Sequence, residues 1–90
     1  MKFLNWNNEK NEQLKAARGI SFEEIAYLIE CGAILGVEEN PGRGNQKIYV
    51  VQVGDYAVAV PFVETDTEIF LKTAFPSRKL AKRYGLKEDP

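Results

Sequence analysis

The sequence contains no histidine and a single cysteine, Cys31. Without histidine the chain cannot carry a Ser-His-Asp triad, a Cys-His nucleophile or a histidine acid–base pair. One cysteine cannot form an internal disulfide, and structural zinc sites need clustered Cys or His ligands. We therefore expect no metal and no cofactor, and the simplest setting is a reducing one, the cytoplasm.

Long hydrophobic runs are also missing. No apolar segment approaches the roughly 20 residues of a membrane-spanning helix, and residues 1–10 lack the apolar core of a signal peptide. The composition, 44% hydrophobic and 28% charged, is that of an ordinary soluble globular domain. A chain of 90 residues fits a single domain, residues 1–90, with no membrane association.

The net charge of −1 conceals an uneven distribution. Residues 20–71 carry two positive and nine negative side chains, whereas residues 72–87 carry six positive and none negative. A basic end on an acidic body favours an anionic partner at one face. The plainer interpretation is a solvated basic helix, and charge alone does not separate the two.

Two helices are expected in the first third of the chain. The first, residues 8–18, begins after the N-cap Asn7 and ends at Gly19. The second begins after Ser21 with the pattern of a capping box. Apolar residues then recur at i, i+3, i+4 and i+7, which predicts a core-facing side, and Gly32 ends the helix.

The rest of the chain is mainly strand-like. Apolar runs predict strands at residues 3–6, 33–38, 46–53, 56–63 and 68–75. Gly54-Asp55 marks a hairpin, and Pro61 predicts a bulge or a free edge nearby because proline cannot donate to a strand ladder. The order predicts an α+β fold, with N-terminal helices packed on one face of an antiparallel β meander and a short basic C-terminal helix.

Lys72 is a first candidate for chemistry. Regular alternation over residues 68–75 would place Phe70, Lys72 and Ala74 on one face of the sheet and the core-facing residues on the other. Apolar neighbours would desolvate the ammonium group and suit it for proton exchange or phosphate binding. The alternative is a lysine whose stem covers apolar surface while its charge stays in water.

The start of the last helix is a second candidate. Free N–H groups after Ser77 would attract an anion, with Arg78 and Lys79 beside it. Further along the same segment lie Lys82, Arg83 and Tyr84, whose ring could stack on a base. The alternatives are a plain helix cap with solvated basic side chains and a tyrosine packed against the edge of the sheet.

Three segments resemble the start of BrnT-type toxins: Phe3-x-x-Trp6, Glu9-Lys10-Asn11 and Arg18-Gly19-Ile20-Ser21-Phe22-Glu23-Glu24. In that family an aromatic-Trp-Asp pattern leads into a helix with Lys and Asn, then into Lys-His-Gly-Val-x-Phe-Glu-Glu. The resemblance is specific over residues 3–24 and extends to the layout of the rest. Arg18 stands where the family has histidine, and Arg78 lies beyond the family's Arg-Arg pair, so the chain resembles a divergent member.

The resemblance implies a RelE-like fold, cleavage of RNA without a metal ion, and a partner antitoxin with a ribbon-helix-helix DNA-binding part. The candidate catalytic residues are then Lys72, Arg78 and Lys79. The candidate RNA-binding residues are Lys10, Arg18, Lys82, Arg83 and Tyr84. One alternative is a non-catalytic RNA- or protein-binding module of the same fold, and another is a structural subunit that associates with itself through an open sheet face.

Overall fold

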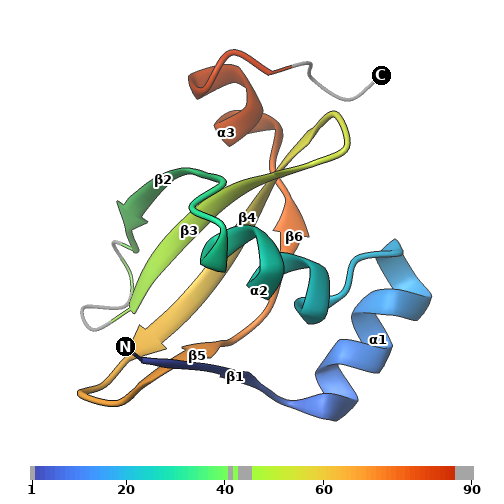
Figure 1. Cartoon of the computed structure of the whole chain (residues 1–90). Helices are drawn as coiled ribbons and strands as arrows, with labels where there is room; N and C mark the ends of the chain where they lie inside the picture. The colour runs from blue at the N-terminus through green and yellow to red at the C-terminus, as the bar shows by residue number, and fades with distance from the viewer. Residues whose placement is uncertain (1, 41, 43–45, 87–90) are drawn as a thin grey trace.

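A computed structural model describes residues 2–40, 42 and 46–86 (Figure 1). Two helices follow a short first strand, a sheet is then completed, and a third helix ends the described chain. In chain order the elements are β1 (Phe3–Trp6), α1 (Asn8–Arg18), α2 (Phe22–Glu30), β2 (Ile34–Glu39), β3 (Gln46–Val53), β4 (Tyr56–Glu64), β5 (Glu68–Leu71), β6 (Phe75–Pro76) and α3 (Arg78–Arg83).

The six strands form one sheet in the order β1-β5-β4-β3-β2, and β6 pairs with the first half of β4. Neighbours from β2 to β6 are antiparallel, which confirms the expected meander. The first strand departs from it, because β1 runs parallel to β5 at the edge of the sheet. The α+β class is confirmed, and the layout is consistent with a RelE-like fold.

The predicted helix ends are confirmed. The Asn7 side chain accepts a hydrogen bond from the Lys10 N–H, and Gly19 ends α1 with a left-handed φ of 67°. The Ser21 side chain accepts from the Glu24 N–H and so caps α2. None of the helices in the described ranges is long and apolar enough to cross a membrane.

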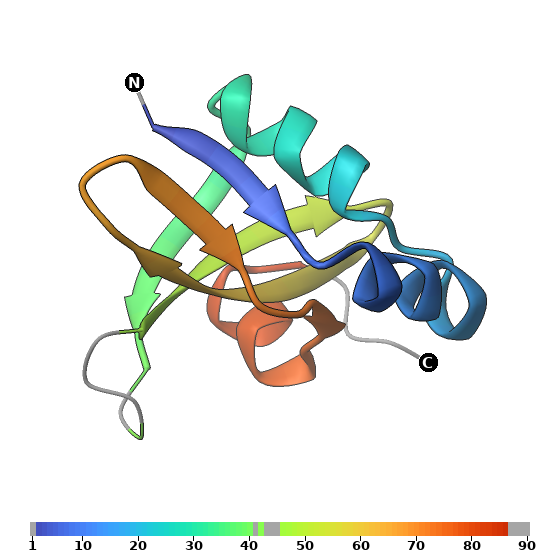
Figure 2. The ribbon, with the colours of Figure 1, turned by 90° about the horizontal axis from the view of Figure 1, so that it is seen from below.

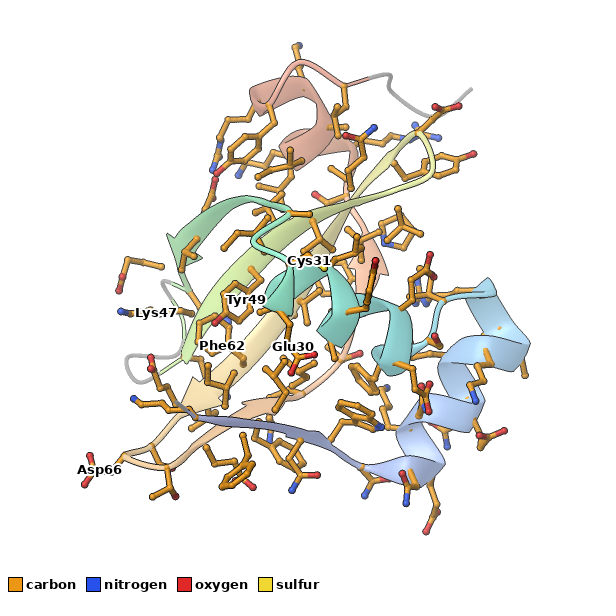
Figure 3. All side chains as sticks on the ribbon, viewed as in Figure 1. Glu30, Cys31, Lys47, Tyr49, Phe62 and Asp66 are labelled. Atoms are coloured by element: carbon orange, nitrogen blue, oxygen red, sulfur yellow. The ribbon has the colours of Figure 1, made fainter. Side chains whose placement is uncertain are left out.

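The sheet is covered on both faces, as Figure 2 shows with α2 above it and α3 below. The main core lies between α2 and one face of the sheet and includes the fully buried Phe22 and Ile25. In this core the Tyr49 and Phe62 rings stack with their centroids 4.1 Å apart (Figure 3). A smaller cluster lies under α3. Its buried members are Val50, Ala57, Ala59, Leu80 and Ala81. Three of these five are alanines, so α3 sits close to the sheet.

A bulge separates β5 from β6. Two residues of β4, Val60 and Pro61, lie between its pairings with β5 and β6, whereas three residues, 72–74, lie on the strand opposite. The Pro61 carbonyl accepts from the Lys72 N–H at 2.8 Å. The irregularity predicted near Pro61 is therefore confirmed, and the extra residue is on the neighbouring strand.

Because of the bulge, the regular alternation of side chains predicted over residues 68–75 is wrong. An extra residue shifts every later side chain to the other face. Ala74 consequently lies in the main core with Leu71, although regular alternation assigned it to the face of Lys72. Phe75, which the sequence placed in the core, is 37% exposed.

A buried asparagine joins α1 to α2. Asn11 is 2% exposed, and its Oδ1 accepts from the Phe22 N–H at 2.8 Å. Its Nδ2 donates to both carboxylate oxygens of Glu23 at 2.9 Å. This hydrogen bond from Asn11 is the main cause that lowers the pKa of Glu23, with Lys15 adding a smaller attraction. Asn11 therefore fixes how α1 lies relative to α2.

Candidate functional site

The candidate residues named above do not form one group. Lys10 is in the first turn of α1 and Arg18 is its last residue, about 12 Å further along the helix axis. Lys72 follows β5 at the bulge. The remaining candidates lie on α3, with Tyr84 as its C-cap. The structure brings only some of these segments together.

Arg18 and Arg78 line the same cleft. The cleft has a volume of about 590 Å³ and lies where the end of α1, the β3–β4 hairpin and the start of α3 meet. It is lined by Arg18, Gly19, Ile20, Val53, Gly54, Tyr56, Ala57, Val58, Pro76, Ser77, Arg78 and Ala81. Two arginines from distant parts of the chain thus face one space.

The walls of the cleft are mostly apolar. Ile20, Ala57, Val58 and Ala81 are all buried side chains of the two hydrophobic clusters. Tyr56, at the start of β4, is 43% exposed and adds an aromatic ring. A mostly apolar cleft lined also by two arginines and a tyrosine suits a ligand that is partly anionic and partly aromatic.

The position of Arg18 follows from the end of α1. Gly19 takes the left-handed conformation that ends the helix, and its N–H donates to the Lys15 carbonyl at 3.1 Å. Ile20 then enters the main core at 6% exposure. The arginine is therefore held between a helix end and a buried residue two positions later.

The position of Arg78 follows from the short strand β6. Pro76 pairs with Val58 of β4, and the Ser77 N–H donates to the Ala57 carbonyl at 2.9 Å. The Ser77 Oγ accepts from the Leu80 N–H at 3.2 Å and caps α3, as predicted. At six residues α3 has a weak dipole, so the guanidinium groups provide the attraction for an anion.

Arg83 and Tyr84 have a structural partner in Glu38 of β2. Arg83 forms an ion pair with Glu38, and the Tyr84 hydroxyl donates to Glu38 Oε2 at 3.0 Å. Hydrogen bonding from Arg83 is the main cause that lowers the pKa of Glu38, while burial and Glu38 raise the pKa of Tyr84. Tyr84 also lies against Gly36, where a Cβ would collide with the tyrosine hydroxyl. These contacts favour the sheet-edge interpretation of Tyr84 and hold α3 on the sheet.

Lys72 is outside the cleft, and the prediction that apolar neighbours desolvate its ammonium group is wrong. The side chain is exposed, and its Nζ lies 5.6 Å from the centroid of the Phe70 ring. Ala74, the second apolar neighbour that the sequence assigned to it, is on the other face because of the bulge. Lys10, Lys79 and Lys82 likewise are not among the residues that line the cleft.

Two residues of this arrangement were missed by the sequence analysis. Tyr56 follows the predicted hairpin Gly54-Asp55 directly, and that position beside a turn was the available signal. Asn11 occurs in the segment that resembles BrnT-type toxins, but no periodicity predicts that a helical asparagine is buried.

Among the described residues, no group of three or more His, Cys, Asp or Glu side chains is suited to hold a metal ion. Comparisons with protein-family models, with curated proteins and with solved structures give no match. The likeness to BrnT-type toxins therefore stays a resemblance.

Proposed function

We propose that this chain is the toxin of a toxin–antitoxin pair and cleaves RNA without a metal ion at the Arg18–Arg78 cleft. The observation that carries the proposal is that these two arginines, one from α1 and one from α3, line one cleft. The α+β layout and the sequence resemblance support it. The RNA and a ribbon-helix-helix antitoxin would both be met in the cytoplasm.

The chemistry is an attack of the ribose 2′ oxygen on the adjacent phosphorus. A bond forms between that oxygen and phosphorus, the bond to the 5′ oxygen breaks, and the two guanidinium groups stabilise the extra negative charge of the transition state. Arg18 and Arg78 provide the positive charges and Tyr56 the phenol among the described residues that line the cleft. The phenol of Tyr56 can donate a proton to the leaving oxygen, and water or a phosphate oxygen takes the 2′ proton.

No lysine or carboxylate among the described residues lines the cleft to act as a base, so we expect cleavage to be slow. The rate should increase as the pH rises, because hydroxide then accepts the 2′ proton more readily. The test uses the chain purified free of partner proteins, a long structured RNA and EDTA at neutral pH. We expect the wild type to cut and an Arg18→Ala/Arg78→Ala variant to lose at least about tenfold in rate, since each guanidinium contributes charge stabilisation. Circular dichroism shows whether the variant is folded.

Two matched variants locate the site. Lys47→Ala removes one positive charge, as either arginine substitution does alone, but Lys47 is at the far end of β3 from Val53, which lines the cleft (Figure 3). It should cut like the wild type. If Lys72→Ala abolishes cleavage and the double arginine variant does not, the reaction belongs to the lysine that the sequence first indicated, and the cleft assignment is wrong.

The second candidate function is an RNA-binding module that does not cut. It is favoured by the absence of a lysine or carboxylate among the described residues that line the cleft. Such a module would retain full-length RNA in EDTA and bind it with an affinity that the double arginine variant lowers. A wild-type chain that binds RNA and leaves it intact, with and without ribosomes, would establish this function in place of the first.

A further inference from the structure

The cleft has more apolar surface than a phosphate needs. A phosphate bound by two arginines requires only the guanidinium groups, whereas here the apolar residues Ile20, Val53 and Pro76 also line the cleft. Tyr56, which is 43% exposed, lines the same cleft and adds an aromatic ring. Aromatic and apolar surface next to a cation is the combination that binds the base and the phosphate of one nucleotide together.

We infer that the cleft takes one unpaired nucleotide of an RNA strand, with its phosphate between Arg18 and Arg78 and its base against Tyr56. The volume of about 590 Å³ is within the usual range of pockets that enclose a small ligand. A base in a duplex is stacked and paired, so its face is not available to a tyrosine. The cleft should therefore select single-stranded segments over double-stranded ones.

The inference deepens the proposed function and rests on its choice of RNA as ligand, but it concerns binding alone. It can hold when cleavage fails. For this reason the test uses 2′-O-methyl RNA, which has no free 2′ hydroxyl to attack the phosphorus and cannot be cut by this reaction. The readout is fluorescence anisotropy of a short labelled strand at fixed, low salt.

The base contact is tested by Tyr56→Ala on two strands, one with bases and one with abasic sugars. Stacking on an aromatic side chain is strong enough that we expect at least about a fivefold loss for the strand with bases. The abasic strand should bind the variant and the wild type equally. Tyr56→Phe should keep the affinity, and Tyr27→Ala is the matched control, because Tyr27 is 67% exposed on α2 and does not line the cleft.

The phosphate contact is tested by Arg18→Ala and Arg78→Ala. Each should weaken both strands and reduce the slope of affinity against salt by about 0.7, the value for one phosphate contact on a single strand. Lys47→Ala, with the same change in charge, should leave the affinity of both strands within about twofold.

The inference would be overturned by any of three results: a duplex bound as tightly as the single strand, an equal effect of Tyr56→Ala on both strands, or an acidic peptide bound as tightly as RNA. Cleavage in EDTA combined with one of these results would keep the proposed function and reject the nucleotide pocket. Selective binding of the single strand without any cleavage would keep the nucleotide pocket and reject RNA cleavage as the function.

Discussion

Replacing Asn11 by alanine tests how α1 is joined to α2. The Asn11 Oδ1 accepts from the Phe22 N–H at 2.8 Å. That N–H is one of the groups at a helix start that have no partner within the helix. Phe22 is fully buried, so no water can replace the lost acceptor unless the helices separate.

The expected magnitude follows from the two contacts of Asn11. A buried N–H left without an acceptor costs about 1–3 kcal/mol. The contact with Glu23 adds little, because that side chain is 58% exposed and solvent screens the interaction. We expect Asn11→Ala to lower the free energy of unfolding by about 1–3 kcal/mol, out of roughly 5–13 kcal/mol for a domain of this length.

The assay is urea unfolding followed by circular dichroism at pH 7. Asn11→Asp is the matched variant, because it keeps an oxygen for the Phe22 N–H but turns the other side of the group into an acceptor that faces the Glu23 carboxylate. Asn11→Asp should therefore be unstable at pH 7 and regain stability when the carboxylates are protonated. A loss below about 0.5 kcal/mol for Asn11→Ala would refute the reasoning.

The same pair gives a pH dependence. The pKa of Glu23 is lowered in the folded state, first by the hydrogen bond from Asn11. A lowered pKa contributes stability above the ordinary value of 4.5, and this contribution is lost as the pH falls through the folded value. The gap between the wild type and Asn11→Ala should narrow below pH 4.5 by the Glu23 contribution, and the Phe22 contribution should remain.

Two further predictions concern the attachment of α3. Gly36→Ala should lower the free energy of unfolding by about 1–3 kcal/mol, because its Cβ would displace the Tyr84 side chain. Thermal unfolding measures this loss. Gly42→Ala is the control, and it should change the unfolding midpoint little because its Cβ would contact nothing within 4 Å. Glu38→Gln should destabilise the fold only slightly at pH 7, because Arg83 is half exposed and solvent screens its ion pair with Glu38. The lowered pKa of Glu38 means that this difference should vanish as the pH falls well below 4.5, and a constant difference down to pH 3 would contradict the assignment.

Local signals predicted much of the fold. Helix ends were predictable because a cap involves a side chain and a backbone group only a few positions apart, as at Asn7 and Ser21. The hairpin at Gly54 and the irregularity near Pro61 were predictable for the same reason, since both depend on what one residue permits the backbone to do.

Features that depend on distant contacts were not predictable in this way. Nothing local to β1 indicates that it pairs in parallel with β5, and the position of the extra residue at 72–74 is set by the strand opposite. The predicted site was affected most, because the neighbours of Lys72 on the sheet were deduced from an alternation of side chains without a bulge. Arg18 and Arg78 were each identified as basic candidates, but only the folded chain shows that they line one cleft.

The parallel pairing of β1 with β5 also bears on how fast the domain folds. The Asn5 side chain donates to Glu68, 63 positions along the chain, and the strand pairing closes a loop of similar length. Closing such a loop costs conformational entropy before the strand contacts that stabilise it can form, so the closure slows folding. The helices α1 and α2 and the β3–β4 hairpin depend on nearby residues and can form early. The first residues of the domain are therefore expected to be among the last to reach their final place.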